Sequence, residues 1–89
     1  MLADYKILIV DDEVDYREMF SLILKEKGYC VYMAACITEA KEIVRNNKID
    51  MVVTDLIMKN ETGIELLYWI KEYDTEIGVI IVTAYGTVV

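Results

Sequence analysis

The sequence contains no histidine and no proline, and it has only four glycines and two cysteines. Without histidine, the chain cannot form a Ser-His-Asp or Cys-His catalytic site, or a zinc site that needs imidazole. Cys30 and Cys36 are too far apart for a CxxC motif, so we expect two reduced thiols. Without proline, the loops must turn on glycine, asparagine, aspartate and threonine.

Basic residues are scarce as well, with 9 lysines and arginines against 16 acidic residues and a net charge of −7. A domain with this balance attracts cations and repels nucleic acid and anionic lipid, so we expect neither as a direct partner. The sequence has no long apolar run and no basic apolar leader before Lys6. We therefore expect no membrane span and a cytoplasmic location.

The 89 residues are enough for one domain, and 56% of them are hydrophobic, which indicates a folded chain with buried strands. Four short apolar segments are typical of strands in a parallel sheet. The segments between them have the spacing of amphipathic helices. The predicted strands are Lys6–Val10, Tyr29–Ala34, Met51–Thr54 and Val79–Thr83.

Three helices are predicted between these strands. We expect Gly28 to end the first helix, Thr38 to be the N-cap of the second, and Gly63 to open the third. The positions on one side of each helix are Tyr16, Met19, Phe20, Ile23 and Lys27 in the first, Ala40, Ile43 and Val44 in the second, and Leu66, Leu67, Ile70 and Tyr73 in the third.

Alternating strands and helices predict an α/β fold with a parallel sheet, in which ligands bind beyond the carboxyl ends of the strands. The first strand ends at Asp11 and Asp12, the third at Asp55, and the fourth at Thr83. If the first and third strands are neighbours, about 4.8 Å apart, their carboxylates converge. Two carboxylates about 4 Å apart repel by about 4 kcal/mol at an effective dielectric of about 20. A small domain needs a cation to offset such repulsion.

Oxygen ligands without histidine favour Mg²⁺ over zinc or copper. Magnesium with free coordination positions commonly binds a phosphoryl group, and an aspartate beside it can accept that group covalently. Each carboxylate has a simpler interpretation when taken alone. Asp11 and Asp12 are good helix caps, and Asp55 is an ordinary residue of a turn after a strand.

Three stretches, "ILIVDDEVDYREMF", "VVTDLIMKNETGIELL" and "VIIVTAYG", resemble the receiver domain of bacterial two-component response regulators. This resemblance implies a flavodoxin-like parallel sheet with the strand order second, first, third, fourth. The ending "VTAYGTVV" further resembles receivers of the nitrogen-regulation class, which precede sigma-54-dependent activator domains. We expect residues 1–89 to form a receiver domain that stops after the fourth strand and lacks the family's fifth strand and last helices.

Carried over by position, the resemblance makes Asp55 the phosphate acceptor and a Mg²⁺ ligand. Asp12 and the backbone carbonyl of Ile57 become further ligands, and Asp11 becomes a ligand that acts through water. Thr83 becomes the hydroxyl that binds a phosphoryl oxygen, with the small Ala84 leaving access. The implied partners are a sensor histidine kinase or phosphotransfer protein and an output domain of the sigma-54-dependent activator type.

The sequence departs from the family pattern at Lys59, which follows Met58 where the family usually has proline. Two other functions stay open. One is a chemically silent interaction fragment, and the other is a Mg²⁺-dependent phosphohydrolase with an aspartyl nucleophile. The latter usually has a second acid two residues after the first, whereas this chain has Ile57.

The segment "GVIIVTA" contains neither proline nor a charge that would prevent intermolecular pairing of strands. We therefore expect the chain to dimerise or exchange segments through the region from Val79 to Val89. We also expect a charge at Ile81 to disrupt that association.

Overall fold

A computed structural model describes residues 4–83 of the chain. Strands and helices alternate along these residues, as the apolar segments predicted. A short two-stranded hairpin, which the sequence pattern did not indicate, precedes the last helix. The elements are β1 (Lys6–Val10), α1 (Val14–Glu26), β2 (Cys30–Ala34), α2 (Ile37–Asn46), β3 (Met51–Asp55), β4 (Ile57–Met58), β5 (Glu61–Thr62), α3 (Gly63–Tyr73) and β6 (Gly78–Val82).

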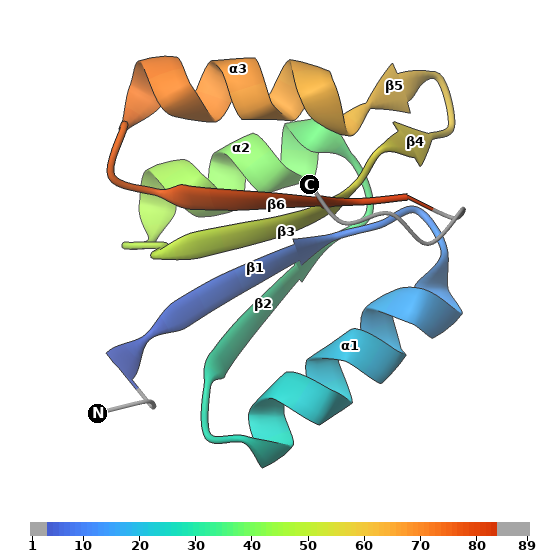
Figure 1. Cartoon of the computed structure of the whole chain (residues 1–89), viewed down its shortest axis with the longest axis vertical. Coiled ribbons are helices and arrows are strands. Elements are labelled where there is room, and N and C mark those ends of the chain that lie inside the picture. The colour runs from blue at the N-terminus through green and yellow to red at the C-terminus, as the bar shows by residue number, and fades with distance from the viewer. Residues whose placement is uncertain (1–3, 84–89) are drawn as a thin grey trace.

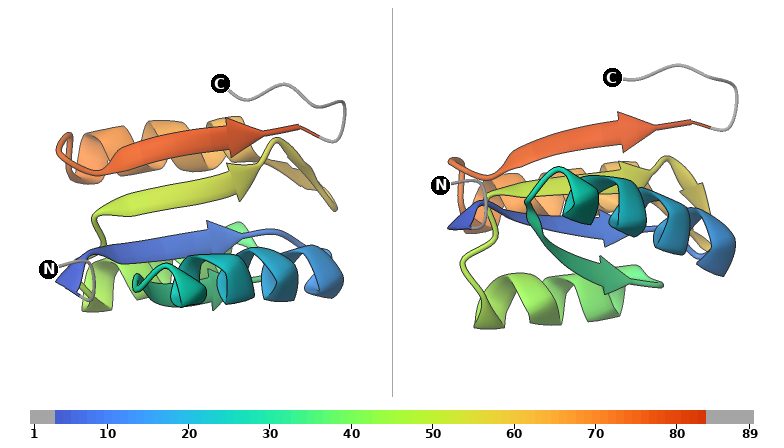
Figure 2. Two further views of the ribbon diagram at one scale, coloured as in Figure 1. Left: turned by 60° about the horizontal axis from the view of Figure 1, so that its bottom comes forward. Right: turned by 90° about the horizontal axis from the view of Figure 1, so that it is seen from below.

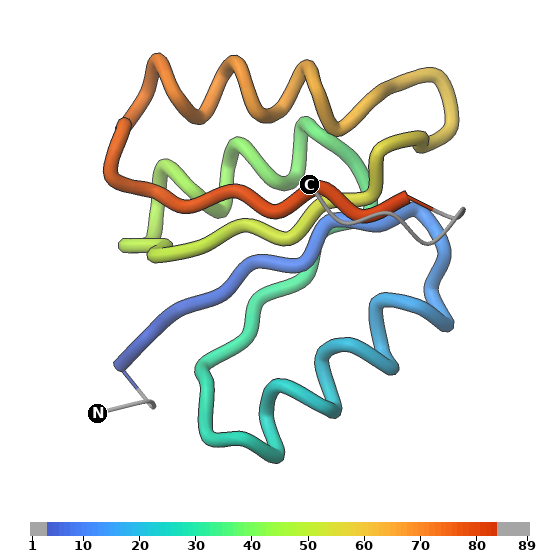
Figure 3. The backbone as a smooth tube through the Cα atoms, viewed as in Figure 1, coloured from blue at the N-terminus to red at the C-terminus, as the bar shows by residue number. Residues whose placement is uncertain are grey.

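The four long strands form one parallel sheet in the order β2-β1-β3-β6 (Figure 1). Because β6 is the fourth long strand along the chain, this is the predicted flavodoxin-like order second, first, third, fourth. Helix α1 lies on one face of the sheet, and α2 and α3 lie on the other (Figures 1 and 2). The tube in Figure 3 shows that β1 and β3, which are far apart in sequence, run side by side.

The main hydrophobic core lies between the sheet and the helices α2 and α3. Its strand members, such as Leu8 and Val52, are fully buried, and they pack against Ala40 and Val44 of α2 and Leu66 and Ile70 of α3. Leu8 and Val52 are also partners in the register of β1 and β3, so their side chains share one face of the sheet. This core fixes β1 beside β3 and thereby aligns their carboxyl ends.

The face under α1 is covered less completely. Helix α1 contacts β1 and β2, so Ile7 and Ile9 of β1 are buried, but Val53 of β3 and Ile80 of β6 remain half-exposed. The apolar side predicted for this helix stays largely in solvent, with exposed residues Tyr16, Met19 and Ile23. The spacing predicted the helix correctly but did not predict how much of that side is buried.

The ends of α1 and α3 agree with the predictions. Gly28 follows α1 with a φ of 96°, a conformation that favours glycine, and its N–H donates to the carbonyl of Lys25. The N–H of Tyr29 donates to the carbonyl of Leu24, which completes a Schellman motif. Gly63 is the first residue of α3, as predicted.

The N-cap prediction for α2 was wrong. Thr38 lies inside the helix, because α2 begins at Ile37 with Cys36 as its N-cap. The free N–H groups at this end are bound by glutamates instead. Glu61 of β5 accepts from the N–H of Ile37 at 2.9 Å, and Glu39 accepts from the N–H of Ala35 at 2.7 Å. A glutamate 24 residues away thus replaces the local hydroxyl cap that the sequence indicated.

The short strands β4 and β5 form an antiparallel hairpin, with Met58 opposite Glu61 and a turn at Lys59 and Asn60. Asn60 has a φ of 65°, and among residues 4–83 it is the only residue other than glycine with positive φ. Lys59 therefore has an ordinary negative φ. These signs are those of a type II turn, in which proline is favoured at the position of Lys59.

The expectation about Ile81 needs correction. A charge at this residue was expected to disrupt association, but only 5% of Ile81 is exposed. Its register partner Thr54 lies on the face of the sheet that α2 and α3 cover, so the side chain of Ile81 points to the same face. A charge at Ile81 would destabilise the fold itself and is no test of association. Residues 84–89 of the predicted association segment lie outside the described residues.

Two further expectations can be compared with the structure. Cys30 and Cys36 both carry free thiols. Within residues 4–83, none of the three helices combines the length and the apolar character needed to cross a membrane.

Candidate functional site

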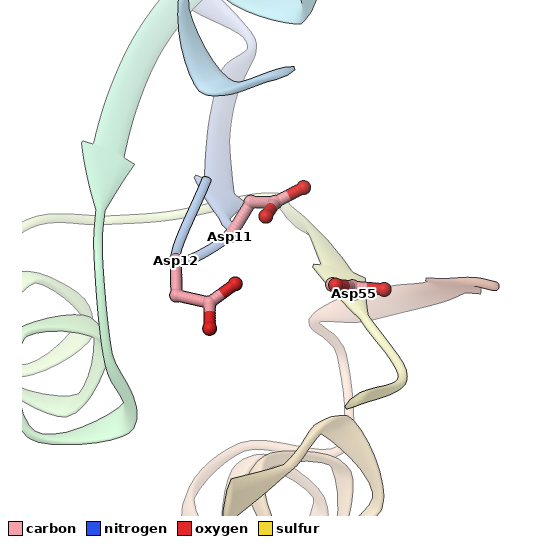
Figure 4. Close-up of side chains that lie close together, drawn as sticks. All are labelled: Asp11, Asp12 and Asp55. Carbon is pink, nitrogen blue, oxygen red and sulfur yellow. The ribbon is translucent and has the colours of Figure 1, made fainter. Parts of the chain in front are cut away.

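Three carboxylates meet at the carboxyl ends of β1 and β3. Asp11 and Asp12 follow the last residue of β1, and Asp55 is the last residue of β3. Each offers a carboxylate oxygen, and these oxygens all lie within 4.8 Å of one another. Figure 4 shows the side chains of Asp11 and Asp12 extending from one strand end and that of Asp55 from the other. The convergence predicted from neighbouring parallel strands is therefore present.

Each carboxylate is held in a different way. Asp11 is buried, and its Oδ1 accepts from the N–H of Glu13 at 2.9 Å. Asp12 is exposed, and its Oδ2 accepts from the backbone N–H of Lys59 at 2.7 Å. The bond from the N–H of Glu13 to Asp11 is a local Asx turn before α1. The N-cap of α1 is Glu13, so neither Asp11 nor Asp12 is the helix cap that the simpler interpretation gave. The bond from Lys59 instead reaches across 47 residues to the β4–β5 hairpin.

The electrostatics of the cluster disfavour full ionisation. Burial raises the pKa of Asp11, and the charges of Asp55 and Asp12 raise it further. The hydrogen bond from the N–H of Glu13 lowers this pKa but does not cancel the increase. Burial also raises the pKa of Asp55, with a further increase from Asp12, although the N–H groups of Leu56 and Ile57 oppose the shift. Both directions are those expected when like charges share a partly desolvated space. A bound cation would relieve this repulsion.

A cavity of about 640 Å³ opens at this cluster. All the residues predicted for the site line it, including Thr83 after β6 and Ile57 at the start of β4. Apolar residues of α1 and the sheet also line the cavity, among them Phe20 and Val53. Ala84, which was expected to leave access to the site, lies outside the described residues.

The donor set fits a hard divalent cation. The clustered side chains of Asp11, Asp12 and Asp55 supply only oxygen atoms, and the sequence has no histidine. Magnesium takes one or two carboxylates and completes its octahedral shell with water and phosphate oxygens. An open cavity beside the carboxylates has room for such ligands.

Sequence reasoning missed a role of Gly63 in this site. A Cβ atom on Gly63 would lie 2.4 Å from the backbone oxygen of Asp55 and 3.1 Å from Cγ2 of Thr54. The N–H of Gly63 donates to the carbonyl of Leu56 at 2.8 Å, which fastens α3 to the end of β3. The sequence identified this glycine only as the start of a helix. The residues around Gly63 in the sequence gave no indication of its close approach to Asp55.

The fold and the acidic cluster together define a flavodoxin-like α/β domain with a cluster of carboxylates at the carboxyl edge of its sheet. The chain belongs to the response regulator receiver domain family of two-component systems, since the model of that family matches residues 7–89. This membership confirms the resemblance carried by the three sequence motifs. It also identifies the chain as a regulatory signalling domain.

Among curated proteins, the chain is similar to sporulation initiation phosphotransferase F of Bacillus subtilis (strain 168), with 40% identity over 85 residues. That match covers 96% of this chain and 68% of the phosphotransferase. The transcriptional regulatory protein ZraR of Klebsiella oxytoca is 38% identical over 82 residues, which are 92% of this chain but only 18% of ZraR.

Solved structures show the same fold. A CheY-like receiver domain protein of Methanospirillum hungatei JF-1 matches with a TM-score of 0.87 and 29% identity, over 93% of this chain and 66% of that one. The beryllofluoride-activated NtrC4 receiver domain, solved as a dimer, matches with a TM-score of 0.84 and 30% identity, over 92% of this chain and 68% of that one.

Proposed function

We propose that this domain accepts a phosphoryl group on Asp55 in a Mg²⁺-dependent reaction. The observation that carries the proposal is the meeting of Asp11, Asp12 and Asp55 within 4.8 Å, in a cavity that Thr83 also lines. Family membership supports a phospho-accepting role.

In this proposal a carboxylate oxygen of Asp55 attacks the phosphorus of a phosphohistidine on a sensor kinase or phosphotransfer protein. The new P–O bond forms as the P–N bond breaks. The electron pair of the P–N bond stays on the imidazole nitrogen, which takes up a proton. The hydroxyl of Thr83 donates to a phosphoryl oxygen and orients the group.

Asp11, Asp12 and Asp55, with the backbone carbonyl of Ile57, would hold the magnesium ion. When bound, the ion offsets negative charge on the carboxylates and on the transferring oxygens. The buried strands β1 and β3 keep the carboxylates in place, since core residues on both strands fix their register.

The proposed output is transcriptional and lies in another domain. ZraR and the response regulator protein PilR of Pseudomonas aeruginosa are much longer relatives, of which this chain spans 18% and 19%. The names of the ZraR relatives mark them as transcriptional regulators. An output domain of the sigma-54-dependent activator type and a cytoplasmic location are part of this proposal.

The proposal is tested by phosphorylation with a small acyl-phosphate donor in the presence of Mg²⁺. We expect Asp55→Asn to abolish incorporation of phosphate, measured by intact mass spectrometry. Asp50→Asn is the matched control, because Asp50 precedes β3 at the opposite end of the sheet and accepts from the N–H of Lys6 at 2.7 Å. Asparagine can keep that hydrogen bond.

Equal labelling of both variants would show that Asp55 is not the acceptor. Failure of the unmodified protein to bind beryllofluoride with Mg²⁺ would favour a chemically silent interaction domain. Steady turnover of a phosphomonoester would instead favour a phosphohydrolase.

A further inference from the structure

The backbone N–H of Lys59 donates a hydrogen bond of 2.7 Å to Oδ2 of Asp12. Asp12 is exposed and follows β1, whereas Lys59 lies in the turn between β4 and β5. The other two carboxylates of the cluster accept from N–H groups one or two residues away in sequence. Among the described residues, Asp12 is thus the carboxylate of the cluster that is held by a distant segment.

The hairpin that carries Lys59 is itself fixed at two points. Glu61 of β5 accepts from the N–H of Ile37 at the start of α2, and the N–H of Gly63 donates to the carbonyl of Leu56. These bonds anchor the hairpin to α2 and to the segment that follows β3. The N–H of Lys59 is therefore held in position before any ligand binds.

We propose that the Lys59 amide is a positioning group for Asp12, and that it sets the affinity of the acidic cluster for Mg²⁺. A carboxylate has two oxygens, and a donor on Oδ2 fixes the plane of the group while Oδ1 stays available to the metal. Hydrogen bonds of this kind to ligating carboxylates typically change metal affinity by about 10- to 100-fold. This inference rests on the proposed function, because it requires that the cluster binds Mg²⁺.

The identity of residue 59 decides whether this bond can form. Proline has no N–H and cannot donate to Asp12. Proline nevertheless suits the backbone of the hairpin, because Asn60 carries the positive φ and position 59 is where type II turns favour proline. Replacement by proline therefore removes the donor with little strain in the turn.

The test compares Lys59→Pro with Lys59→Ala by calorimetric titration of the metal-free protein with Mg²⁺. Both variants lose the lysine side chain, but only the proline variant loses the N–H. We expect Lys59→Pro to bind Mg²⁺ about tenfold more weakly than Lys59→Ala. A backbone ester between Met58 and Lys59, made by semisynthesis, removes the N–H while keeping the lysine side chain, and we expect the same weakening.

Equal affinity of Lys59→Pro and Lys59→Ala, or tighter binding by the proline variant, would overturn the inference while leaving the proposed function intact. If Lys59→Pro does not fold, as judged by circular dichroism, the ester variant decides in its place. No binding of Mg²⁺ by the unmodified protein would overturn the proposed function and this inference together.

Discussion

The ionised carboxylate of Asp55 destabilises the folded, metal-free protein because of its surroundings. Burial and the charge of Asp12 raise its pKa above the ordinary value of 3.8. The folded state therefore binds a proton more tightly than the unfolded state does. The free energy of unfolding must then fall as the pH rises from about 3.8 through the raised pKa, and it stays lowered at neutral pH.

We expect Asp55→Asn to be more stable than the unmodified protein at neutral pH without metal, because the variant has no charge to bury. The gain should vanish below the ordinary carboxyl pKa, where Asp55 is neutral in both states. Urea unfolding in a chelator, followed from about pH 3 to pH 7, measures this difference. Asp50→Asn serves as the control at the other end of β3. A gain for Asp55→Asn that is the same at every pH would contradict the electrostatic cause.

The junction of β3 and α3 shows how two elements position one side chain. Gly63 begins α3 where the chain passes the end of β3, so close that a Cβ atom would lie 2.4 Å from the backbone oxygen of Asp55. That neighbour is backbone, which cannot move aside as a flexible side chain can. The φ of Gly63 is not in the left-handed region, so its backbone conformation does not call for glycine. The site requires glycine here because there is no space for a Cβ atom.

We expect Gly63→Ala to destabilise the fold by about 1–3 kcal/mol, because the strand end or the helix must shift to remove the clash. Mg²⁺ affinity should fall as well, since the shift moves Asp55. Thermal unfolding and calorimetric titration measure the two effects. Gly78→Ala in β6 is the matched control, because its Cβ atom would meet Met51 at an ordinary 3.8 Å. Equal stability of the two alanine variants would contradict this account.

At the scale of the whole molecule, β6 lies at one side of the sheet. It pairs with β3, and within residues 4–83 no strand pairs with its other edge. Its residues Ile80 and Val82 are half-exposed on the face that α1 covers incompletely. An open strand edge beside apolar side chains favours pairing with another chain.

We expect the purified 89-residue chain to associate through β6 at about 100 μM, and sedimentation velocity measures this. Ile80→Lys should weaken the association, because it places a charge beside the open edge on a half-exposed side chain. Ile81→Lys is the contrasting variant, since Ile81 is buried and its replacement should unfold the domain. A compact monomer at this concentration would show that the edge does not mediate association.

Local patterns in the sequence were enough for the long elements and for the identity of the acidic residues. Short apolar segments set the four strands, helical spacing set the three helices, and Gly28 and Gly63 marked helix ends. The position of Asp11, Asp12 and Asp55 after two strands, combined with parallel pairing, was enough to predict that they meet. These features depend on residues a few positions apart and on the geometry that all parallel sheets share.

Other features depend on how the packed elements meet, and no local pattern contains them. The Lys59 amide reaches Asp12 across 47 residues, and Glu61 caps α2 across 24 residues where the local pattern had favoured Thr38. The exposure of Tyr16 on α1 and the burial of Ile81 likewise follow from which half of the sheet each helix covers. Periodicity gives the direction of a side chain relative to its own element, whereas its partners are set by the surface that packs against it.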